Sequence, residues 1–254
     1  MNYTPDELMT VAAARLLDND HVCFVGIGLP SAACNLARLT HAPKLTLIYE
    51  SGTIGTRPTV LPLSIGDGEL CDRALTTVSV PEIFRYWLQG GHVSIGFLSA
   101  AQVDRFGNLN STVIGSYDRP TVRLPGAGGA PEIATGCREV FIIMRQSPRS
   151  FVSRLDFMTT PGHGDGVDRR TAPATHVKGP TKVITDLCVM EPHPQAKELT
   201  VTSLHPGVTI QQVKDATGWD VAFALNLTET SPPTSRELDV LRDLQKRTAV
   251  AHAG

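Results

Sequence analysis

Mainly apolar runs and a helical repeat alternate along the first half of the chain. Residues 21–26 and 45–50 are continuous runs, and residues 30–39 between them repeat apolar side chains at helical spacing after a proline. A strand, a helix and a strand within about 30 residues are typical of a parallel crossover unit. Residues 92–98 and 139–144 are further runs of this kind. Since these runs are continuous rather than alternating, the sequence predicts an α/β fold with a mostly parallel, doubly wound sheet covered on both faces.

Capping side chains mark where the first and last helices begin. Thr4, Pro5 and Glu7 combine a capping hydroxyl, a proline at the first helical position and a glutamate that completes a capping box. Thr234 and Glu237 repeat the capping box near the C-terminus. The sequence therefore predicts one helix near each end of the chain.

The C-terminal half has a different pattern. Residues 160–180 are rich in Gly, Pro, Thr and His, which predicts a lid or a linker. Residues 182–190 and 198–204 predict two antiparallel strands that extend the sheet, and residues 208–218 predict a short helix. No internal repeat divides the chain, so a single domain is expected over residues 1–254.

Composition and charge narrow the kind of protein. With 254 residues, 41% of them hydrophobic, the chain is long enough to bury a large core. The 23 Lys and Arg residues against 25 Asp and Glu give a formal charge of -2, which argues against nucleic acid or a membrane surface as a partner. The five cysteines are widely spaced and lie mostly in apolar runs, which favours free thiols over disulfides. With no leader-like N-terminus and no long apolar run, this predicts a cytoplasmic location.

Three loops carry closely spaced glycines, at residues 26–31, 50–55 and 124–132. In a doubly wound sheet, ligands bind beyond the carboxyl ends of the strands. Glycines there let the backbone approach a ligand and present amide hydrogens to it. The glycines are Gly26 and Gly28 in the first loop, Gly52 and Gly55 in the second, and Gly126, Gly128 and Gly129 in the third. We therefore expect the loops to form a binding site.

The first two loops have half of a dinucleotide-binding fingerprint. Gly26 and Gly28 begin a GxGxxG pattern, and Glu50 lies about 20 residues on, where a ribose-binding acid belongs. However, Ser31 replaces the third glycine. A ribose-binding acid also gives no reason for the glycines after Glu50 or for the third loop. The dinucleotide interpretation is therefore the weaker one.

The other interpretation makes Glu50 a nucleophile. A glutamate is ionised at neutral pH, so it needs only a reachable electrophile and donors for the oxyanion that forms. Attack on an acyl thioester gives an acyl-glutamyl anhydride, which the released thiolate converts into a glutamyl thioester. The flanking glycines would clear space for the substrate. Taken alone, a glutamate at a strand end is more often solvated, and asparagines such as Asn108 and Asn110 are more often turn residues.

Several motifs follow one another along the chain: VGIGLPS, LIYESGTIG, LPLSIGDGEL, AQVDRFGNLNSTVIG, RLPGAGGAPEIA, QSPRSFVSRLDFMTT and SLHPGVT. In this order they resemble the β subunit of class I CoA-transferases, from about Glu7 to the last helix. Within the family the likeness is greatest to the 3-oxoadipate type, with the glutaconate type next. Linked motifs in order are more specific than any single glycine loop.

The resemblance implies a role for each candidate residue. In the family, the glutamate of the E(S/N)G motif is the covalent nucleophile, and Glu50 occupies that place. Asn110, the second asparagine of the GNxNST motif, is expected to hydrogen-bond near the reacting carbonyl or to orient the glutamate. The glycine loops help to form the oxyanion and CoA-binding site, and the residues implied are Gly26, Gly28, Gly126, Gly128 and Gly129.

The same resemblance implies a reaction and its partners. CoA would pass from succinyl-CoA to a 3-oxo-dicarboxylic acid, with 3-oxoadipate, from aromatic degradation, as the leading acceptor. A CoA-transferase α subunit is the expected partner, in an αβ or α2β2 enzyme with CoA bound between subunits. The CoA thioester is a substrate, so no permanently bound cofactor is expected. Residues 167–180 depart from the family's glycine- and leucine-rich pattern, which bears on the acceptor acid more than on the reaction type.

Two other functions stay open on the sequence. An acyl-CoA hydrolase of the same superfamily would release free thiol without an acceptor acid. One ring-opening subgroup has lost the glutamate, so Glu50 argues against that chemistry. A non-catalytic module would use the same scaffold to bind a metabolite. His163 and Asp165 lie in a glycine-rich loop without a second histidine at ligand spacing, so no metal site is expected.

Overall fold

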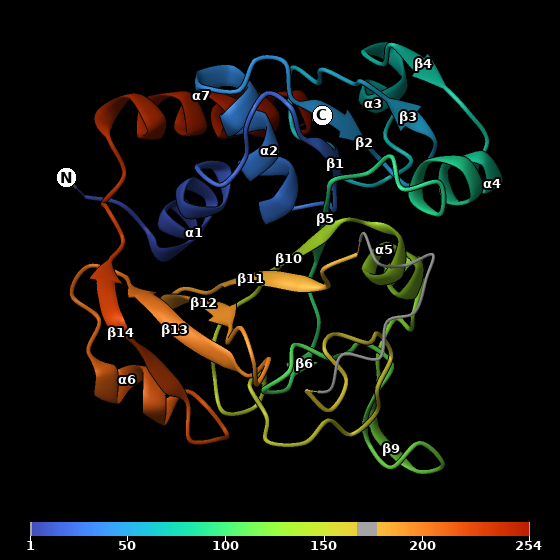
Figure 1. Cartoon of the computed structure of the whole chain (residues 1–254). Helices are drawn as coiled ribbons and strands as arrows, with labels where there is room; N and C mark the ends of the chain where they lie inside the picture. Colours follow the sequence, from blue (N-terminus) through green and yellow to red (C-terminus); the bar gives the residue numbers. More distant parts are fainter. Residues whose placement is uncertain (1, 167–176, 254) are drawn as a thin grey trace. The chain divides into compact units, whose positions relative to one another are not determined.

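A computed structural model of the chain describes residues 2–166 and 177–253. They form two compact units, one from residues up to 97 together with those from 232 onward, and one from residues 98–231 (Figure 1). The expectation of a single domain stays a prediction. So does the lid at 160–180, because residues 167–176 lie outside the described residues.

The sheet of the first unit has parallel strands at its centre. Its strands lie in the order β5-β1-β2-β3-β4. Their bounds are β1 Val22–Phe24, β2 Thr46–Ile48, β3 Thr53–Ile54, β4 Thr76–Thr77 and β5 Ile95–Leu98. β1 pairs in parallel with β2 and β5, and α2 (Leu29–Thr40) joins β1 to β2 as the predicted crossover. β3 pairs antiparallel with β2 and with β4, which the apolar pattern did not predict because both strands are two residues long.

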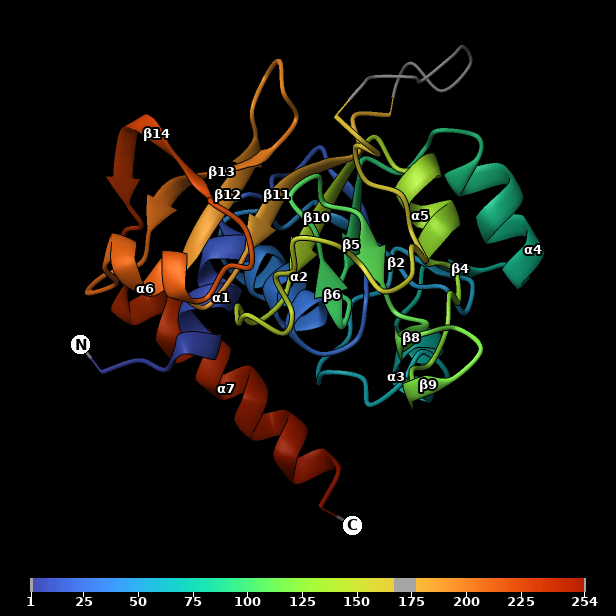
Figure 2. The ribbon, with the colours of Figure 1, turned by 90° about the horizontal axis from the view of Figure 1, so that it is seen from below.

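The first unit contains both predicted terminal helices. Its other helical segments are α1 Pro5–Ala14, α3 Gly68–Asp72, α4 Val80–Glu82, the π-helix η1 Ile83–Leu88 and α7 Ser235–Ala251. The capping boxes of α1 and α7 are both present, as the sequence predicts. Figure 2 shows α7 running beside α1 and α2, against which it packs. The buried face of α7 carries Leu238, Leu241 and Leu244.

The second unit is a sheet with strand order β14-β13-β12-β11-β10. Its strands are β10 Glu139–Ile143, β11 Pro180–Ile184, β12 Cys188–Pro192, β13 Leu199–Leu204 and β14 Ala222–Glu229. β12 pairs antiparallel with β11 and β13, and the β10–β11 and β13–β14 pairs are parallel. Residues 182–190, predicted as one strand, belong to two strands. The Thr185 hydroxyl accepts the Leu187 and Cys188 amides at 3.0 and 2.9 Å, so the chain turns there.

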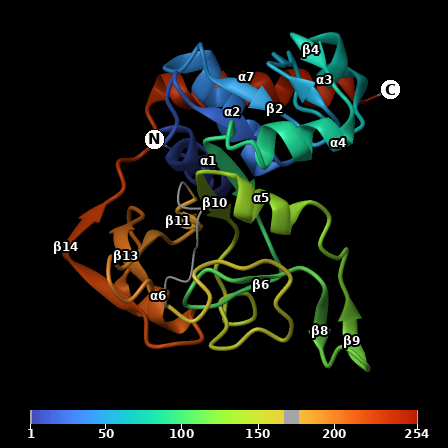
Figure 3. The same ribbon diagram turned by 45° about the vertical axis from the view of Figure 1, so that its right-hand side comes forward.

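Short elements complete the second unit. They are β6 Gln102–Val103, β7 Leu109–Asn110, β8 Val113–Gly115, β9 Pro120–Arg123, α5 Ala130–Gly136 and α6 Ile210–Asp215. Figure 3 shows the β8–β9 hairpin projecting from this unit. The predicted α/β fold with antiparallel C-terminal strands is confirmed. In the part of the chain that the structure describes, no helix is both long and apolar enough to cross a membrane.

Candidate active site

Glu50 lies at the corner of a tight turn between β2 and β3. The Gly52 N–H donates to the Tyr49 carbonyl at 3.0 Å, and the Tyr49 N–H donates to the Thr53 carbonyl at 3.1 Å. These two bonds close a turn around Glu50 and Ser51. The carboxylate therefore stands directly beyond a buried strand, and Glu50 is only half-buried.

The glycines after Glu50 are required by packing. Gly52 has φ +103°, and a Cβ there would lie 1.9 Å from the Val78 carbonyl oxygen. A Cβ at Gly55, where φ is +64°, would lie 3.0 Å from the Leu75 Cβ. A side chain at Gly52 would therefore collide with backbone. This corrects the expectation that these glycines clear space for a substrate, because that space is already filled by the residues around β4.

A buried hydrogen bond ties this turn to the start of α2. The hydroxyls of Tyr49 and Ser31 are 2.6 Å apart, and both side chains are fully buried. Burial raises the pKa of Tyr49, so the phenol stays neutral. Ser31 stands where the dinucleotide fingerprint requires its third glycine. A serine used for a bond within the chain weakens the dinucleotide interpretation further.

The first glycine loop presents the N-terminus of α2. Gly28 is the N-cap residue with φ +83°, and a Cβ there would meet no atom within 4 Å. No side chain caps this helix, so its first amide groups depend on backbone, water or a ligand. Gly26 precedes this position and packs beside Pro30. Because a helix N-terminus carries partial positive charge, this loop can stabilise a negative charge.

The third glycine loop leads into α5 in the second unit. Gly126 and Gly128 have φ +103° and +50°, and a Cβ at either would meet no atom within 4 Å. Gly129 is the N-cap residue of α5. Ser111 holds the loop, because it accepts the Gly126 N–H at 2.8 Å and its hydroxyl donates to the Gly126 carbonyl at 2.8 Å. These glycines are therefore needed for the backbone conformation and leave open space beside the loop.

Asn110 is fully buried, and its side chain is bonded within the second unit. Its Nδ2 donates to the Gln102 side chain and to the Val113 carbonyl, both at 2.7 Å. Its Oδ1 accepts the amides of Thr112 and Val113 at 3.0 and 3.3 Å. Both hydrogens of the amide are used, which favours shaping the loop over direct contact with a reacting carbonyl. The role that the resemblance implies stays a prediction.

The predicted site residues are divided between the two units. The first unit holds Gly26, Gly28 and Glu50, and the second holds Asn110, Gly126, Gly128 and Gly129. The Tyr49–Ser31 bond joins the two loops of the first unit, and Ser111 joins the Asn110 segment to the glycine loop of the second. Sequence reasoning did not assign Tyr49 or Ser111 to the site. The serine in place of a fingerprint glycine was the signal for the first of these bonds.

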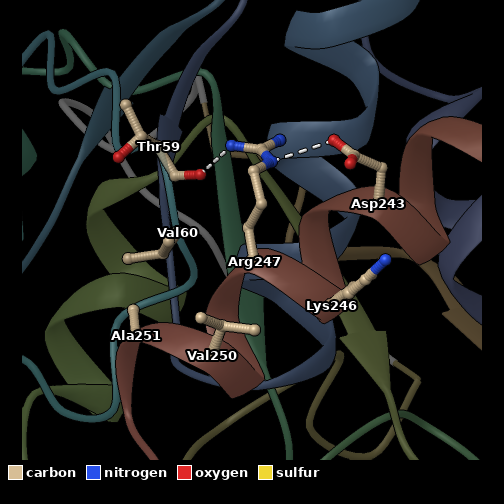
Figure 4. A pocket seen from close by; sticks show the side chains of 7 residues that line it. All are labelled: Thr59, Val60, Asp243, Lys246, Arg247, Val250 and Ala251. Carbon is tan, nitrogen blue, oxygen red and sulfur yellow. Dashed lines mark hydrogen bonds and ion pairs between the residues drawn. The ribbon is translucent and has the colours of Figure 1, made fainter.

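A separate groove of about 400 Å³ lies between α7 and the segment around Thr59 (Figure 4). Arg247 donates to the Thr59 carbonyl and, at 2.9 Å, to Asp243. None of the predicted site residues lines this groove, so it is not the candidate site. Within residues 2–166 and 177–253, no group of three or more His, Cys, Asp or Glu side chains is placed to hold a metal ion.

Comparison with known proteins decides the family. The family model for coenzyme A transferase matches residues 7–216, a stretch that includes every predicted site residue. The chain belongs to the coenzyme A transferase family. This transferase chain is 62% identical over 250 residues to the β subunit of the 3-oxoadipate CoA-transferase of Pseudomonas knackmussii, covering 98% of this chain and 96% of that protein.

Two solved structures extend the comparison. Glutaconate coenzyme A-transferase of Acidaminococcus fermentans matches this transferase chain with a TM-score of 0.89 at 30% identity, covering 95% of this chain and 94% of that one. The decarboxylase AibA/AibB matches with a TM-score of 0.83 at 28% identity, covering 97% and 96%. A decarboxylase on the same fold means that the reaction must be argued from the site.

Proposed function

We propose that this chain is the β subunit of a CoA-transferase that moves CoA from succinyl-CoA to a 3-oxo-dicarboxylic acid, 3-oxoadipate first among them. Glu50 is the covalent nucleophile. The observation that carries the proposal is a half-buried carboxylate at the corner of a closed turn, in a chain 62% identical to the β subunit of a 3-oxoadipate CoA-transferase. The name of that relative supplies the acceptor acid.

The reaction proceeds by two exchanges at one carboxylate. A Glu50 oxygen attacks the succinyl-CoA carbonyl carbon, the carbon–sulfur bond breaks, and the CoA thiolate leaves an acyl-glutamyl anhydride. The thiolate then attacks the glutamyl carbonyl carbon, and succinate leaves as a carboxylate. The acceptor acid repeats the two steps in reverse on the glutamyl thioester. No proton is gained or lost overall, and the thioester energy is kept because water takes no part.

Backbone amides support the negative charge that develops in each attack. The start of α2 at Gly28 provides such donors in the first unit, and Gly126, Gly128 and Gly129 are proposed to contact the CoA thioester. Loss of one oxyanion donor typically costs about 3–4 kcal/mol of barrier. A CoA-transferase α subunit is the proposed partner, since the relative is itself one subunit of its enzyme. CoA is a substrate, and no permanently bound cofactor is part of the proposal.

The test is to trap the glutamyl thioester. The chain co-purified with its partner subunit is incubated with succinyl-CoA and no acceptor, and the digested protein is analysed by mass spectrometry. We expect a CoA adduct on the peptide that holds Glu50, lost after borohydride treatment and absent from Glu50→Gln. An active wild-type pair without the adduct, or full turnover by Glu50→Gln, would contradict the proposal.

The same experiment separates the other two functions. An acyl-CoA hydrolase would release free thiol continuously without an acceptor acid. A non-catalytic module would bind acyl-CoA without turnover, and Glu50→Gln would change only the affinity. Thiol release measured with and without 3-oxoadipate therefore distinguishes transfer, hydrolysis and binding.

A further inference from the structure

The buried hydroxyl pair of Tyr49 and Ser31 has no part in the mechanism described above. Tyr49 directly precedes Glu50, and Ser31 is in the first turn of α2, three residues after Gly28. Their oxygens are 2.6 Å apart, and neither side chain is accessible to solvent. The bond thus joins the residue before the proposed nucleophile to the helix start that presents the Gly28 loop.

Further hydrogen bonds hold the same face of α2. The Asn35 Nδ2 donates to the Ser31 carbonyl at 2.9 Å, and the Arg38 Nη2 donates to the Asn35 Oδ1 at 3.0 Å. Arg38 also donates to the Pro58 carbonyl at 2.8 Å. Ser31, Asn35 and Arg38 are spaced i, i+4 and i+7, so they lie on one side of the helix. The start of α2 is therefore fixed by polar contacts of defined direction.

This bond contributes little to stability that an apolar pair could not supply. A buried hydrogen bond contributes about 0.5–1.5 kcal/mol net, and replacing both partners by apolar groups of similar shape is often nearly neutral. What an apolar pair lacks is direction, because hydrophobic contact is non-directional. The hydroxyl pair fixes the distance between two backbone segments, and a catalytic site depends on such distances.

We propose that Tyr49 and Ser31 are positioning residues for the transferase reaction. Their hydrogen bond holds the Glu50 turn at a fixed distance from the N-terminal amides of α2, where the oxyanion formed by attack of Glu50 is stabilised. This inference rests on the proposed function of Glu50. A displacement of about 1 Å at a reacting centre can cost about 100-fold in rate, so loss of the bond is expected to slow the chemical step.

The test compares Tyr49→Phe, Ser31→Ala and the double variant, each co-purified with the partner subunit. The rate of the borohydride-sensitive adduct is measured in a single turnover at saturating succinyl-CoA, together with KM and the melting temperature. Each single variant should form the adduct at least tenfold more slowly with KM within twofold of wild type. The double variant should be no slower than the slower single variant, because both changes remove one bond.

Stability separates positioning from a structural role. A single variant leaves one buried hydroxyl unpaired and should lower the melting temperature, whereas the double variant removes both hydroxyls and should recover most of it. We expect its rate to stay low. A rate that recovers with the melting temperature would overturn the inference and assign the pair a structural role only.

Thr56→Val is the matched control. The Thr56 hydroxyl is buried in the same unit and donates to the Leu70 carbonyl at 2.8 Å, away from the Glu50 turn. This variant should lose stability and keep the wild-type rate. If the wild-type pair forms the adduct on Glu50 and both single variants match its rate, the inference fails and the proposed function stands. If the wild-type pair forms no adduct, the proposed function fails first.

Discussion

At the scale of single residues, the turn that carries Glu50 is determined by what its neighbours exclude. The sequence motif places glycines after the glutamate, and the simplest chemical explanation is space for a substrate. The structure gives another reason at Gly52, where the Val78 carbonyl fills the space that a Cβ would need. The glycine serves the backbone conformation, and the half-buried carboxylate is held in place as a result.

Gly52→Ala should therefore destabilise the first unit strongly. The new Cβ would lie 1.9 Å from the Val78 carbonyl oxygen on a backbone with φ +103°, so the turn must shift. We expect a loss of more than about 3 kcal/mol in the free energy of unfolding, measured by chemical denaturation. Gly28→Ala is the matched comparison, because Gly28 has φ +83° with no atom within 4 Å of its Cβ position. It should cost about 1–2 kcal/mol. Equal losses for the two variants would contradict this account.

Asn110 and Asn108 show how far a motif defines a residue's role. Both belong to the FGNLNST stretch, and both side chains are buried and bonded within the second unit. Asn108 holds the loop after Thr160, since its Oδ1 accepts the Gly162 and Gly164 amides at 2.8 and 3.1 Å. A motif identifies both residues as constrained, but only their partners show that the constraint lies in the loops they shape.

At the scale of elements, the two capping boxes also join the helices they begin. Glu7 of the α1 box accepts a hydrogen bond from Arg242 of α7 at 2.6 Å, and Glu237 of the α7 box accepts from Arg15 at 2.7 Å. Each capping glutamate thus binds an arginine of the other helix. Burial acts to raise the pKa of Glu237, but the hydrogen bonds from Arg15 and Thr234 outweigh it and lower the pKa to about 2.

This arrangement predicts how the stability of the first unit depends on pH. A carboxylate whose pKa is lower in the folded state stabilises it above the unfolded pKa, about 4.3, and loses that contribution as the pH falls toward 2. Glu237→Gln should lower the free energy of unfolding at pH 7 by about 1–3 kcal/mol, because a charge-assisted bond is lost. The difference from wild type should shrink between about pH 4.5 and pH 2 in denaturation measured across that range.

An exposed pair on the same helix is the control for Glu237→Gln. The Asp243 side chain is 64% exposed and pairs with Arg247 at 2.9 Å, four residues on (Figure 4). Asp243→Asn should change the stability by about 0.5 kcal/mol or less, because exposed ion pairs contribute little. A loss as large as that of Glu237→Gln would mean that helix charge in general, and not the contact with α1, determines the effect.

The elements that the sequence predicts are those with a strong local signal. Continuous apolar runs identify β1, β2, β5 and β10, and hydroxyl–glutamate spacing identifies the starts of α1 and α7. β3 and β4 are two residues long and depend on contacts far along the chain, so no local period reveals them. The turn within residues 182–190 depends on one threonine hydroxyl, which an apolar count does not detect.

At the scale of the whole molecule, the linked motifs predict the family, and the site can be predicted only in part. The order of the motifs along the chain leads to the coenzyme A transferase family, and the family model and the relatives confirm it. The position of Glu50 after an apolar strand also follows from the sequence. The Tyr49–Ser31 bond does not, because it joins residues 18 positions apart through side chains whose burial depends on the folded sheet.

The last prediction concerns the partner subunit. A relative that matches 98% of this chain is one subunit of its enzyme, so this chain should lack part of what turnover requires. Large apolar side chains of the first unit are also exposed, with Leu75 at 85%, Leu63 at 65% and Tyr86 at 58%. We expect the chain purified alone to show less than about 1% of the transferase rate of the co-expressed pair, in an assay with succinyl-CoA and 3-oxoadipate. Glu50→Gln should co-purify with the partner as well as wild type does and still be inactive, which separates assembly from chemistry. Turnover by the isolated chain at the rate of the pair would contradict the requirement for a partner.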